Sequence, residues 1–245
     1  MTARTAIVTG GTGAIGTEIC RQLSQAGCRV GALGHPSEAA RVADWKKTLG
    51  FEVAVELADL GDYDAARAAM NQLQAALGPA DILVNAAGIT RDSRFSKMTP
   101  EQWRAVLGSN LDSVFNCTQA VFENMCARGF GRIINISSVN GQKGQFGQTN
   151  YSAAKAGMHG FSMALAQEGA AKGVTVNTVS PGYIETPMTS AIKPEALEKI
   201  KAQIPLGRMG TPAEIARVVV FLSAAESGYI TGANIPVNVG LFISA

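Results

Sequence analysis

The chain has 245 residues, and its 47% hydrophobic content against 16% charged residues supplies enough apolar surface for a buried core, which excludes an intrinsically disordered chain. The formal net charge of +2 and the lack of a Lys/Arg block exclude a nucleic-acid partner. No charged-then-apolar leader precedes the first predicted strand and no apolar run is long enough to span a bilayer, so we expect a cytoplasmic protein without a membrane partner.

Seven short apolar runs alternate with segments of helical length along the chain. This alternation predicts an α/β fold with a doubly wound parallel sheet of seven strands and helices on both faces. Because the motifs near the start and beyond the middle must meet at one sheet, we expect a single domain over residues 1–245. The predicted strands are residues 5–9, 29–33, 52–56, 82–85, 132–137, 175–180 and 234–237.

A glycine-rich loop, residues 10–16, follows the first predicted strand and precedes a helix-forming stretch, 17–25. Glycine lets the backbone turn tightly and approach a pyrophosphate, while the free amides at the start of the helix attract its negative charge. The order of strand, loop and helix therefore predicts a Rossmann fold and a dinucleotide-binding catalytic domain.

Local signals mark several other elements. Residues 99–102 and 211–214 each form a capping box with proline at the first helical position, so their side chains are expected to be structural. Residues 183–210 contain three prolines and form the longest stretch without a predicted strand. We interpret them as a substrate lid.

Tyr151 and Lys155 stand four residues apart in a predicted helix, which places both side chains on one face. An adjacent ammonium favours the phenolate and brings the tyrosine pKa towards the range of a general acid. Ser138, after the strand at 132–137, could donate a second hydrogen bond to the same substrate oxygen. The set indicates carbonyl reduction, although a Tyr-x-x-x-Lys pair alone is also typical of an ordinary helix surface. His159, on the same face, is expected to pack against a neighbouring helix or subunit.

In their order, these motifs resemble the short-chain dehydrogenase/reductase family over essentially the whole chain. The resemblance adds Asn110 to the catalytic set of Ser138, Tyr151 and Lys155, with Asn110 positioning a water that returns a proton to the lysine. The chain departs from the family pattern at two positions, Ala14 and Ala86, where alanine replaces the residue that the family usually carries. The cofactor-binding residues that it implies are Gly10, Gly13, Ala14, Ile15, Gly16, Gly34, Glu38, Asp59, Leu60, Asn85, Ala86, Ala87, Gly88, Tyr151, Lys155, Pro181, Gly182, Ile184 and Thr186.

Within the family, residues 138–151 and 88–92 are most similar to the acetoacetyl-CoA reductases of polyhydroxyalkanoate (polyhydroxybutyrate) biosynthesis. This resemblance implies NAD(P)H-dependent reduction of acetoacetyl-CoA to (3R)-3-hydroxybutyryl-CoA. The alternatives are a 3-oxoacyl-[acyl-carrier-protein] reductase of fatty acid synthesis and, from another class, a non-catalytic dinucleotide-binding regulator. The candidate substrate contacts are Ser138, Gln145, Phe146, Gln148, Tyr151 and Tyr183.

Other assignments for the substrate side remain open. Phe146 could be packed core and the glutamines solvated loop. Arg91, Arg94 and Lys97 could attract the phosphates of coenzyme A, or could form a solvated basic face.

Cofactor choice depends on two places where the resembling family often carries a basic residue. Neither Gly13 nor the loop at residues 34–38 offers Lys or Arg. Glu38 could repel a 2′-phosphate or accept a hydrogen bond from a ribose hydroxyl, whereas Arg41 lies farther along and could reach back. We favour NADH over NADPH.

The remaining expectations concern metals and partners. The four cysteines form no Cys-x-x-Cys pair and the two histidines have no cluster of further ligands, so we expect structural thiols and no catalytic metal. The chain ends in an apolar segment, 241–245, that a monomer would expose. We expect a homo-oligomer, which the family resemblance implies to be a homotetramer, acting on an acyl-CoA thioester.

Overall fold

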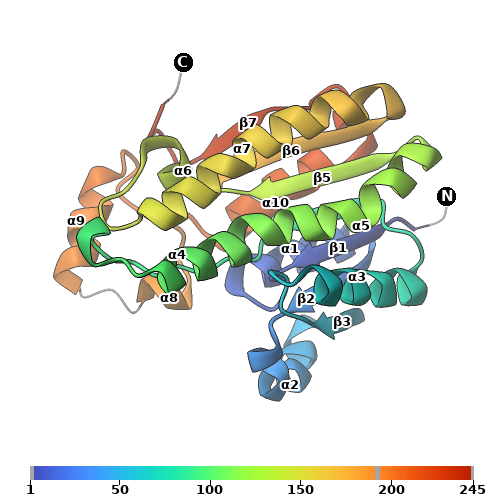
Figure 1. Cartoon of the computed structure of the whole chain (residues 1–245), viewed down its shortest axis with the longest axis horizontal. Helices are drawn as coiled ribbons and strands as arrows, with labels where there is room; N and C mark the ends of the chain where they lie inside the picture. Colours follow the sequence, from blue (N-terminus) through green and yellow to red (C-terminus); the bar gives the residue numbers. More distant parts are fainter. Residues whose placement is uncertain (1–2, 191–193, 244–245) are drawn as a thin grey trace.

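The computed structural model describes residues 3–190 and 194–243 and is built on one parallel sheet (Figure 1). The seven strands lie in the order β3-β2-β1-β4-β5-β6-β7. Strands β1 to β3 are added towards one edge of the sheet and β4 to β7 towards the other, so the strand order reverses between β1 and β4. The predicted doubly wound sheet is confirmed, and in such sheets ligands bind outside the carboxyl ends of the strands at the point of reversal. The strands are β1 (Thr5–Thr9), β2 (Arg29–Gly34), β3 (Val53–Leu57), β4 (Ile82–Asn85), β5 (Gly131–Ile136), β6 (Val174–Pro181) and β7 (Asn234–Val237).

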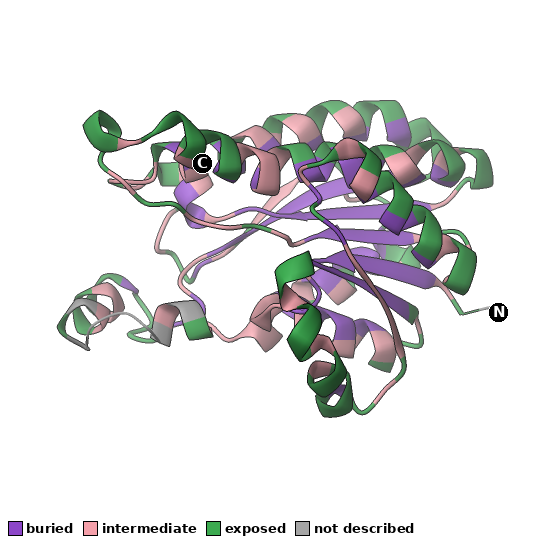
Figure 2. Cartoon of the chain, turned by 60° about the horizontal axis from the view of Figure 1, so that its bottom comes forward, coloured by how far each residue is buried: buried purple, intermediate pink, exposed green. Residues whose placement is uncertain are grey.

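Helices cover both faces of the sheet, and the buried strands lie between them (Figure 2). Ala6 and Val8 of β1 join the core cluster that contains α1 and α10, whereas Ile7 joins the cluster that contains α3 and α5. Successive side chains of a strand point to opposite faces, which is why the runs are almost wholly apolar. The helices are α1 (Ala14–Gln25), α2 (Ala39–Leu49), α3 (Tyr63–Leu77), α4 (Pro100–Leu107), α5 (Ser113–Arg128), α6 (Val139–Lys143), α7 (Thr149–Gly169), α8 (Pro187–Ser190), α9 (Pro194–Gln203) and α10 (Pro212–Ser223).

The start of α1 differs most from the predicted boundary, because the helix begins at Ala14 rather than at residue 17. Gly13 is its N-cap, and a Cβ added at Gly16 would lie 2.1 Å from the carbonyl oxygen of Gly10. The first helical turn is thus folded into the glycine loop. Glycine has a low helix propensity, so the sequence pattern placed the start too late.

Both predicted capping boxes are confirmed. The backbone N–H of Gln102 donates to Oγ1 of Thr99 at 3.2 Å, and the N–H of Thr99 donates to Oε1 of Gln102 at 3.0 Å. Thr211 and Glu214 form the same reciprocal pair at the start of α10. These side chains fix the helix ends and are structural, as expected.

The segment interpreted as a lid is closed at its base. The N–H of Glu185 donates to the carbonyl of Gly210 at 2.8 Å, and the N–H of Gly210 donates to the carbonyl of Tyr183 at 2.9 Å. Helices α8 and α9 lie between these two ends, while residues 191–193 of the segment lie outside the described residues.

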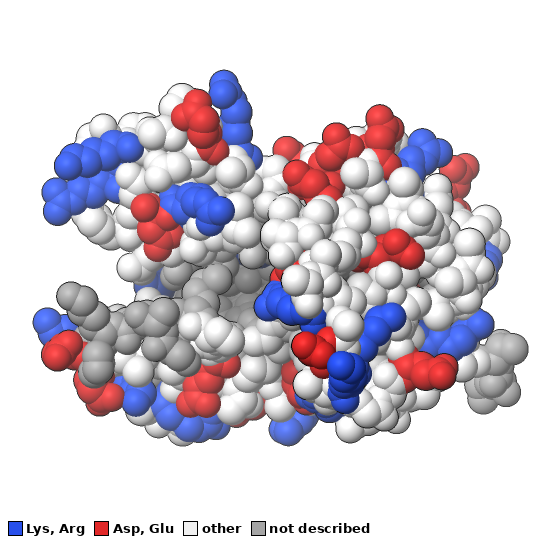
Figure 3. Space-filling view, turned by 90° about the horizontal axis from the view of Figure 1, so that it is seen from below, with Lys and Arg blue, Asp and Glu red and all other residues white. Residues whose placement is uncertain are grey.

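One face of the molecule carries charges of both signs (Figure 3). Lys and Arg side chains are interspersed with Asp and Glu on the face shown in Figure 3. Of the helices formed by residues 3–190 and 194–243, none is long and apolar enough to cross a membrane.

Val239, after β7, has a φ of 54°, and it is the one non-glycine residue with positive φ in the described part of the chain. A β-branched residue is strained in this region because its Cβ crowds the backbone. Its segment lies beside the end of β6, since a Cβ added at Gly182 would be 3.1 Å from Cα of Asn238.

We expect Val239→Gly to raise the free energy of unfolding by about 0.5–1 kcal/mol, because the strain relieved exceeds the added entropy of glycine in the unfolded chain. Urea denaturation measures the change. Val239→Ala is the matched control, since alanine keeps a Cβ and should gain less than half as much. A destabilised glycine variant would contradict the assignment of strain.

Candidate active site

A cavity of about 220 Å³ lies at the carboxyl ends of β1 to β4. Its walls come from the loops that follow these four strands, as expected for the switch point of a parallel sheet. Most of the predicted cofactor residues of these loops line it. The lining residues are Gly10, Thr12, Gly13, Leu33, Gly34, His35, Glu38, Ala58, Asp59, Leu60, Ala86, Ala87, Gly88, Ile89 and Ser109.

The glycine loop is shaped by close backbone contacts. A Cβ at Gly10, where φ is 62°, would lie 2.9 Å from Cα of Ala87, so only glycine lets the β1 and β4 loops meet. The N-cap of α1 at Gly13 makes no side-chain hydrogen bond, and no acidic residue stands in the first turn of the helix. Free amides and an uncompensated helix dipole suit an anionic group, so these residues fit the pyrophosphate of a dinucleotide.

The carboxylate of Glu38 lies at the wall of the cavity beyond β2. Its Oε2 accepts hydrogen bonds from the Thr12 hydroxyl and, at 3.0 Å, from the N–H of His35, while its Oε1 pairs with Arg41. Burial raises the pKa of Glu38, but the bonds from Thr12, His35 and Arg41 outweigh it, so the pKa lies below the ordinary value. A fixed negative charge therefore stands at this end of the cavity.

Several predicted cofactor residues lie outside the lining of this cavity. The side chain of Asn85 is buried and donates to Oγ1 of Thr118 and Oδ1 of Asn135, so it ties β4 to α5 and β5. Ile15 and Ile184 pack on the core, and Ala14 and Gly16 belong to the first turn of α1. Pro181, Gly182 and Thr186 follow the neighbouring part of the sheet, at and after the end of β6.

Lys155 reaches from α7 to the end of β5. Its Nζ donates to the carbonyl of Ile136 at 2.8 Å, and only 4% of the residue is exposed. Burial lowers the pKa of Lys155 to about 7. This contact is possible because α6 and α7 approach closely: a Cβ at Gly141 would lie 2.9 Å from Cβ of Lys155.

Tyr151 lies one turn earlier on α7, with its ring centroid 5.7 Å from Nζ of Lys155. Burial raises the pKa of Tyr151, a hydrogen bond with Ser138 opposes this, and the charge of Asp92 adds to the increase. The prediction that Lys155 lowers the Tyr151 pKa is therefore wrong for this arrangement. The ammonium is directed to Ile136, and its own burial weakens its charge near neutral pH.

Ser138 lies between β5 and α6 and serves as the N-cap of α6. Its Oγ accepts a hydrogen bond from the N–H of Asn140 at 3.1 Å. Its side chain also forms the hydrogen bond with the Tyr151 phenol that opposes the increase in the Tyr151 pKa. The two hydroxyl groups are therefore neighbours.

Asn110 is fully buried in a π-helical segment, Gly108–Asp112. Its Oδ1 accepts from the N–H of Ile89 at 2.7 Å, and its Nδ2 donates to the carbonyl of Ile89 at 3.0 Å. A Cβ at Gly88 would lie 3.0 Å from Asn110 Oδ1 and 3.4 Å from Lys155 Nζ, so the three residues are neighbours. The side chain holds the wall of the cavity, and its role in positioning a water stays a prediction.

Gln148 is engaged by other side chains. Its Oε1 accepts from Nδ2 of Asn140 at 2.9 Å, and its Nε2 donates to Oδ2 of Asp92 at 2.9 Å. It therefore bridges the loop after β4 and helix α6, in addition to any contact with substrate. Asp92 and Asn140 were not predicted, and only their place in the segments 88–92 and 138–151 pointed to them.

Phe146 is 81% exposed, so the alternative that it is packed core is wrong. The guanidinium carbon of Arg94 lies 5.9 Å from the centroid of its ring. Gln145 accepts from Nζ of Lys143 at 3.3 Å, and burial raises the pKa of half-buried Tyr183. The segment between Ser138 and Tyr151 therefore exposes an aromatic ring with a cation beside it, and such a surface can bind a ligand.

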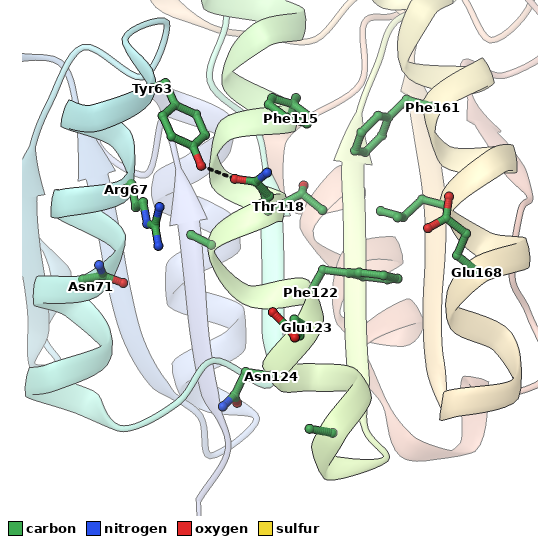
Figure 4. A pocket seen from close by; sticks show the side chains of 14 residues that line it. Tyr63, Arg67, Asn71, Phe115, Thr118, Phe122, Glu123, Asn124, Phe161 and Glu168 are labelled. Carbon is green, nitrogen blue, oxygen red and sulfur yellow. Dashed lines mark hydrogen bonds between the residues drawn. The ribbon is translucent and has the colours of Figure 1, made fainter.

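A larger hollow of about 870 Å³ lies elsewhere, between α3, α5 and α7 (Figure 4). Tyr63, Phe115, Phe122 and Phe161 are directed towards it, and the Tyr63 hydroxyl donates to Gln119. It contains none of the predicted site residues. The smaller cavity is lined by most of the predicted cofactor residues of the β1 to β4 loops, so it is the candidate cofactor site.

In the described part of the chain, no group of three or more His, Cys, Asp or Glu side chains could hold a metal ion. The four cysteines are free thiols. Burial raises the pKa values of Cys20 and Cys117 to about 12, which suits structural thiols.

The fold and the paired hydroxyls define a dinucleotide-dependent oxidoreductase, and comparisons with known proteins agree. A family model described as Enoyl-(Acyl carrier protein) reductase matches residues 11–242. The chain belongs to the short-chain dehydrogenase/reductase family.

Individual relatives match over nearly their whole length. The chain is 58% identical to an acetoacetyl-CoA reductase of Allochromatium vinosum, over 98% of this chain and 99% of that protein. It is 54% identical to an acetoacetyl-CoA reductase of Cupriavidus necator, again over 98% and 99% of the two chains. A 3-oxoacyl-[acyl-carrier-protein] reductase FabG of Pseudomonas aeruginosa is 42% identical over 98% of each chain.

The lowered pKa of Lys155 predicts a pH-dependent stability. The ordinary pKa of 10.5 applies to the unfolded chain, whereas the folded chain binds this proton only below about 7. Between these values the unfolded state binds more protons, so the contribution of Lys155 to stability increases as pH rises from 7 and is lost as pH falls.

We expect the difference in unfolding free energy between the wild type and Lys155→Met to grow by about 1–2 kcal/mol from pH 7.0 to pH 8.5. Denaturant titrations at both values measure it. Taking the difference between the two proteins removes the contributions of the other titrating groups, which both proteins share. A difference that is the same at both pH values would show that Lys155 keeps its ordinary pKa.

Proposed function

We propose that this protein reduces acetoacetyl-CoA to (3R)-3-hydroxybutyryl-CoA with a reduced nicotinamide cofactor, and so supplies polyhydroxybutyrate synthesis. The observation that carries the proposal is the pair of hydroxyls of Ser138 and Tyr151, held beside buried Lys155 next to a dinucleotide cavity. The two acetoacetyl-CoA reductases that match at 54–58% identity support the substrate.

The bound cofactor would supply a hydride to the C3 carbonyl of the substrate. Tyr151 then donates its proton to the developing alkoxide, and its raised pKa keeps that proton in place until the oxygen becomes basic. Ser138 donates a hydrogen bond to the same oxygen, an interaction that strengthens as charge develops. Lys155, with a pKa of about 7, can bind and release a proton near neutrality and so can return one to the tyrosine.

The acyl-CoA substrate would contact the segments beside Ser138. The exposed ring of Phe146 and the guanidinium of Arg94 would receive the pantetheine and phosphates of coenzyme A. Tyr183 begins the segment 183–210, which we propose closes over the substrate as a lid. Rate measurements with acetoacetyl-CoA and with acetoacetyl-acyl-carrier-protein separate this function from that of the FabG relative.

We propose NADH as the preferred cofactor. The cavity is lined by the carboxylates Glu38 and Asp59, and its described lining contains no Lys or Arg. At the end of the second strand of a Rossmann fold, a carboxylate accepts hydrogen bonds from the ribose hydroxyls of NADH and repels a 2′-phosphate. NADPH would require Arg41 to leave Glu38.

We also propose that the protein acts as a homotetramer in the cytoplasm. Phe115, Met163 and Phe221 are 49–53% exposed, and Ile243 near the end of the chain is 82% exposed, so association would cover apolar surface. The four free cysteines suit a reducing compartment.

Tyr151→Phe tests the proton donor. We expect its kcat with acetoacetyl-CoA to fall by about 10²–10⁴-fold, because the hydride acceptor loses its acid, while the dissociation constant of the reduced cofactor changes little. Stopped-flow absorbance and fluorescence titration measure the two quantities. Tyr229→Phe, at a fully exposed tyrosine, is the matched control and should leave both unchanged. Normal turnover of Tyr151→Phe would refute the assignment.

Glu38→Gln tests the cofactor. The substitution removes the charge and releases Arg41, so we expect the ratio of kcat/KM for NADPH to that for NADH to rise by about 10-fold, as for the loss of one close charge repulsion. Glu18→Gln, which breaks the similar pair with Arg21 on α1, should leave the ratio unchanged. A wild-type preference for NADPH would contradict the proposal and assign phosphate binding to Arg41.

A further inference from the structure

His159 lies one helical turn after Lys155 on α7, and no step of the proposed reaction uses it. Instead of a neighbouring helix, its Nε2 meets two serines of the sheet: it is 2.9 Å from Oγ of Ser137 and 3.3 Å from Oγ of Ser180. Ser137 follows β5 and directly precedes Ser138. Ser180 lies in β6 directly before Pro181. One imidazole thus contacts two strand ends that both lead to predicted site residues.

The hydrogen bonds of the two serines determine which group donates. Ser137 donates its one hydroxyl proton to the carbonyl of Lys155 at 2.8 Å, and Ser180 donates its proton to Oδ1 of Asn234 at 2.7 Å. Only oxygen lone pairs therefore face His159. Its Nε2 must carry a proton and donate to both serines. Because both serines are buried, loss of this donor would leave their oxygens without that partner, away from water.

These bonds close a ring around the end of β5. Lys155 donates from Nζ to Ile136, Ser137 donates to the backbone of Lys155, and His159 donates to Ser137. Residue 138 follows directly, so its hydroxyl is placed by this ring. Through Ser180, the same imidazole holds the strand that leads into Pro181 and Gly182, two of the cofactor-binding residues that the family resemblance implies.

We propose that His159 is a positioning residue for hydride transfer. By donating to Ser137 and Ser180 it sets the distance between the Ser138–Tyr151 hydroxyl pair and the segment at Pro181 that would bind the cofactor. The inference rests on the proposed function, since it concerns the approach of hydride donor and acceptor. Small changes in this approach alter the rate of the chemical step more than they alter binding.

Two substitutions separate positioning from packing. His159→Leu fills similar space without a donor, whereas His159→Gln presents an amide N–H at about the reach of Nε2. We expect His159→Leu to lower kcat with acetoacetyl-CoA by about 10-fold, with KM values within about twofold of the wild type. The deuterium isotope effect with cofactor labelled at C4 should rise in the same variant. His159→Gln should restore most of the rate and lower the isotope effect again.

Two results of this comparison of variants would overturn the proposal. A leucine variant with wild-type kcat and isotope effect would show that the imidazole only fills space. Leucine and glutamine variants that lose the same activity, in proportion to a lower melting temperature, would show a purely structural role.

The wild-type protein and a second readout keep the inference separate from the substrate assignment. No cofactor oxidation by the wild type would refute the proposed substrate alone.

The second readout is NMR of the histidine side chains. The chain has two histidines, so ¹⁵N-histidine labelling gives signals from two imidazoles, and the His35→Gln variant identifies which signal belongs to His159. We expect the Nε2–H tautomer for His159 and a changed Nε2 shift in the Ser137→Ala, Ser180→Ala double variant. An unprotonated Nε2, or a shift that is unchanged in the double variant, would overturn the inference.

Discussion

The contact on which the site depends is the hydrogen bond from the buried ammonium of Lys155 to the carbonyl of Ile136. It joins α7 to the carboxyl end of β5, and so brings Tyr151 to Ser138 although the two belong to different elements. Burial at this place also lowers the lysine pKa to about 7. The geometry and the proton chemistry of the site therefore have one physical origin, which is the removal of this amine from water.

The cofactor side depends on a second constraint, the absence of Cβ atoms between the β1 and β4 loops. Gly10 leaves no room for a side chain against Ala87, and Gly88 lets the β4 loop pass Asn110 and Lys155. The candidate cofactor cavity and the proposed catalytic side chains thus share one wall. A hydride donor bound in the cavity would be presented towards Tyr151 because the sheet reverses its order at that place.

The sequence predicted the sheet well, because continuous apolar runs separated by segments of helical length leave a strong pattern. The bounds of β1 and β4, whose residues are all buried, agree with the prediction. The sequence predicted less well those features of the structure that depend on contacts between distant segments. Three features depend on neighbours that no local pattern contains: the start of α1 inside the glycine loop, the bridge made by Gln148 and the direction of the shift in the Tyr151 pKa. His159 shows the same limit: its spacing gave the helix face, but not the two serines that it meets.

The most direct test of carbonyl reduction at this site follows the hydride itself. The protein is incubated with acetoacetyl-CoA and reduced cofactor carrying two deuterium atoms at nicotinamide C4, and the acyl product is analysed by mass spectrometry and NMR. We expect 3-hydroxybutyryl-CoA with one deuterium at C3, formed in step with cofactor oxidation. An unlabelled product, or no product although the cofactor binds, would contradict direct carbonyl reduction at this site.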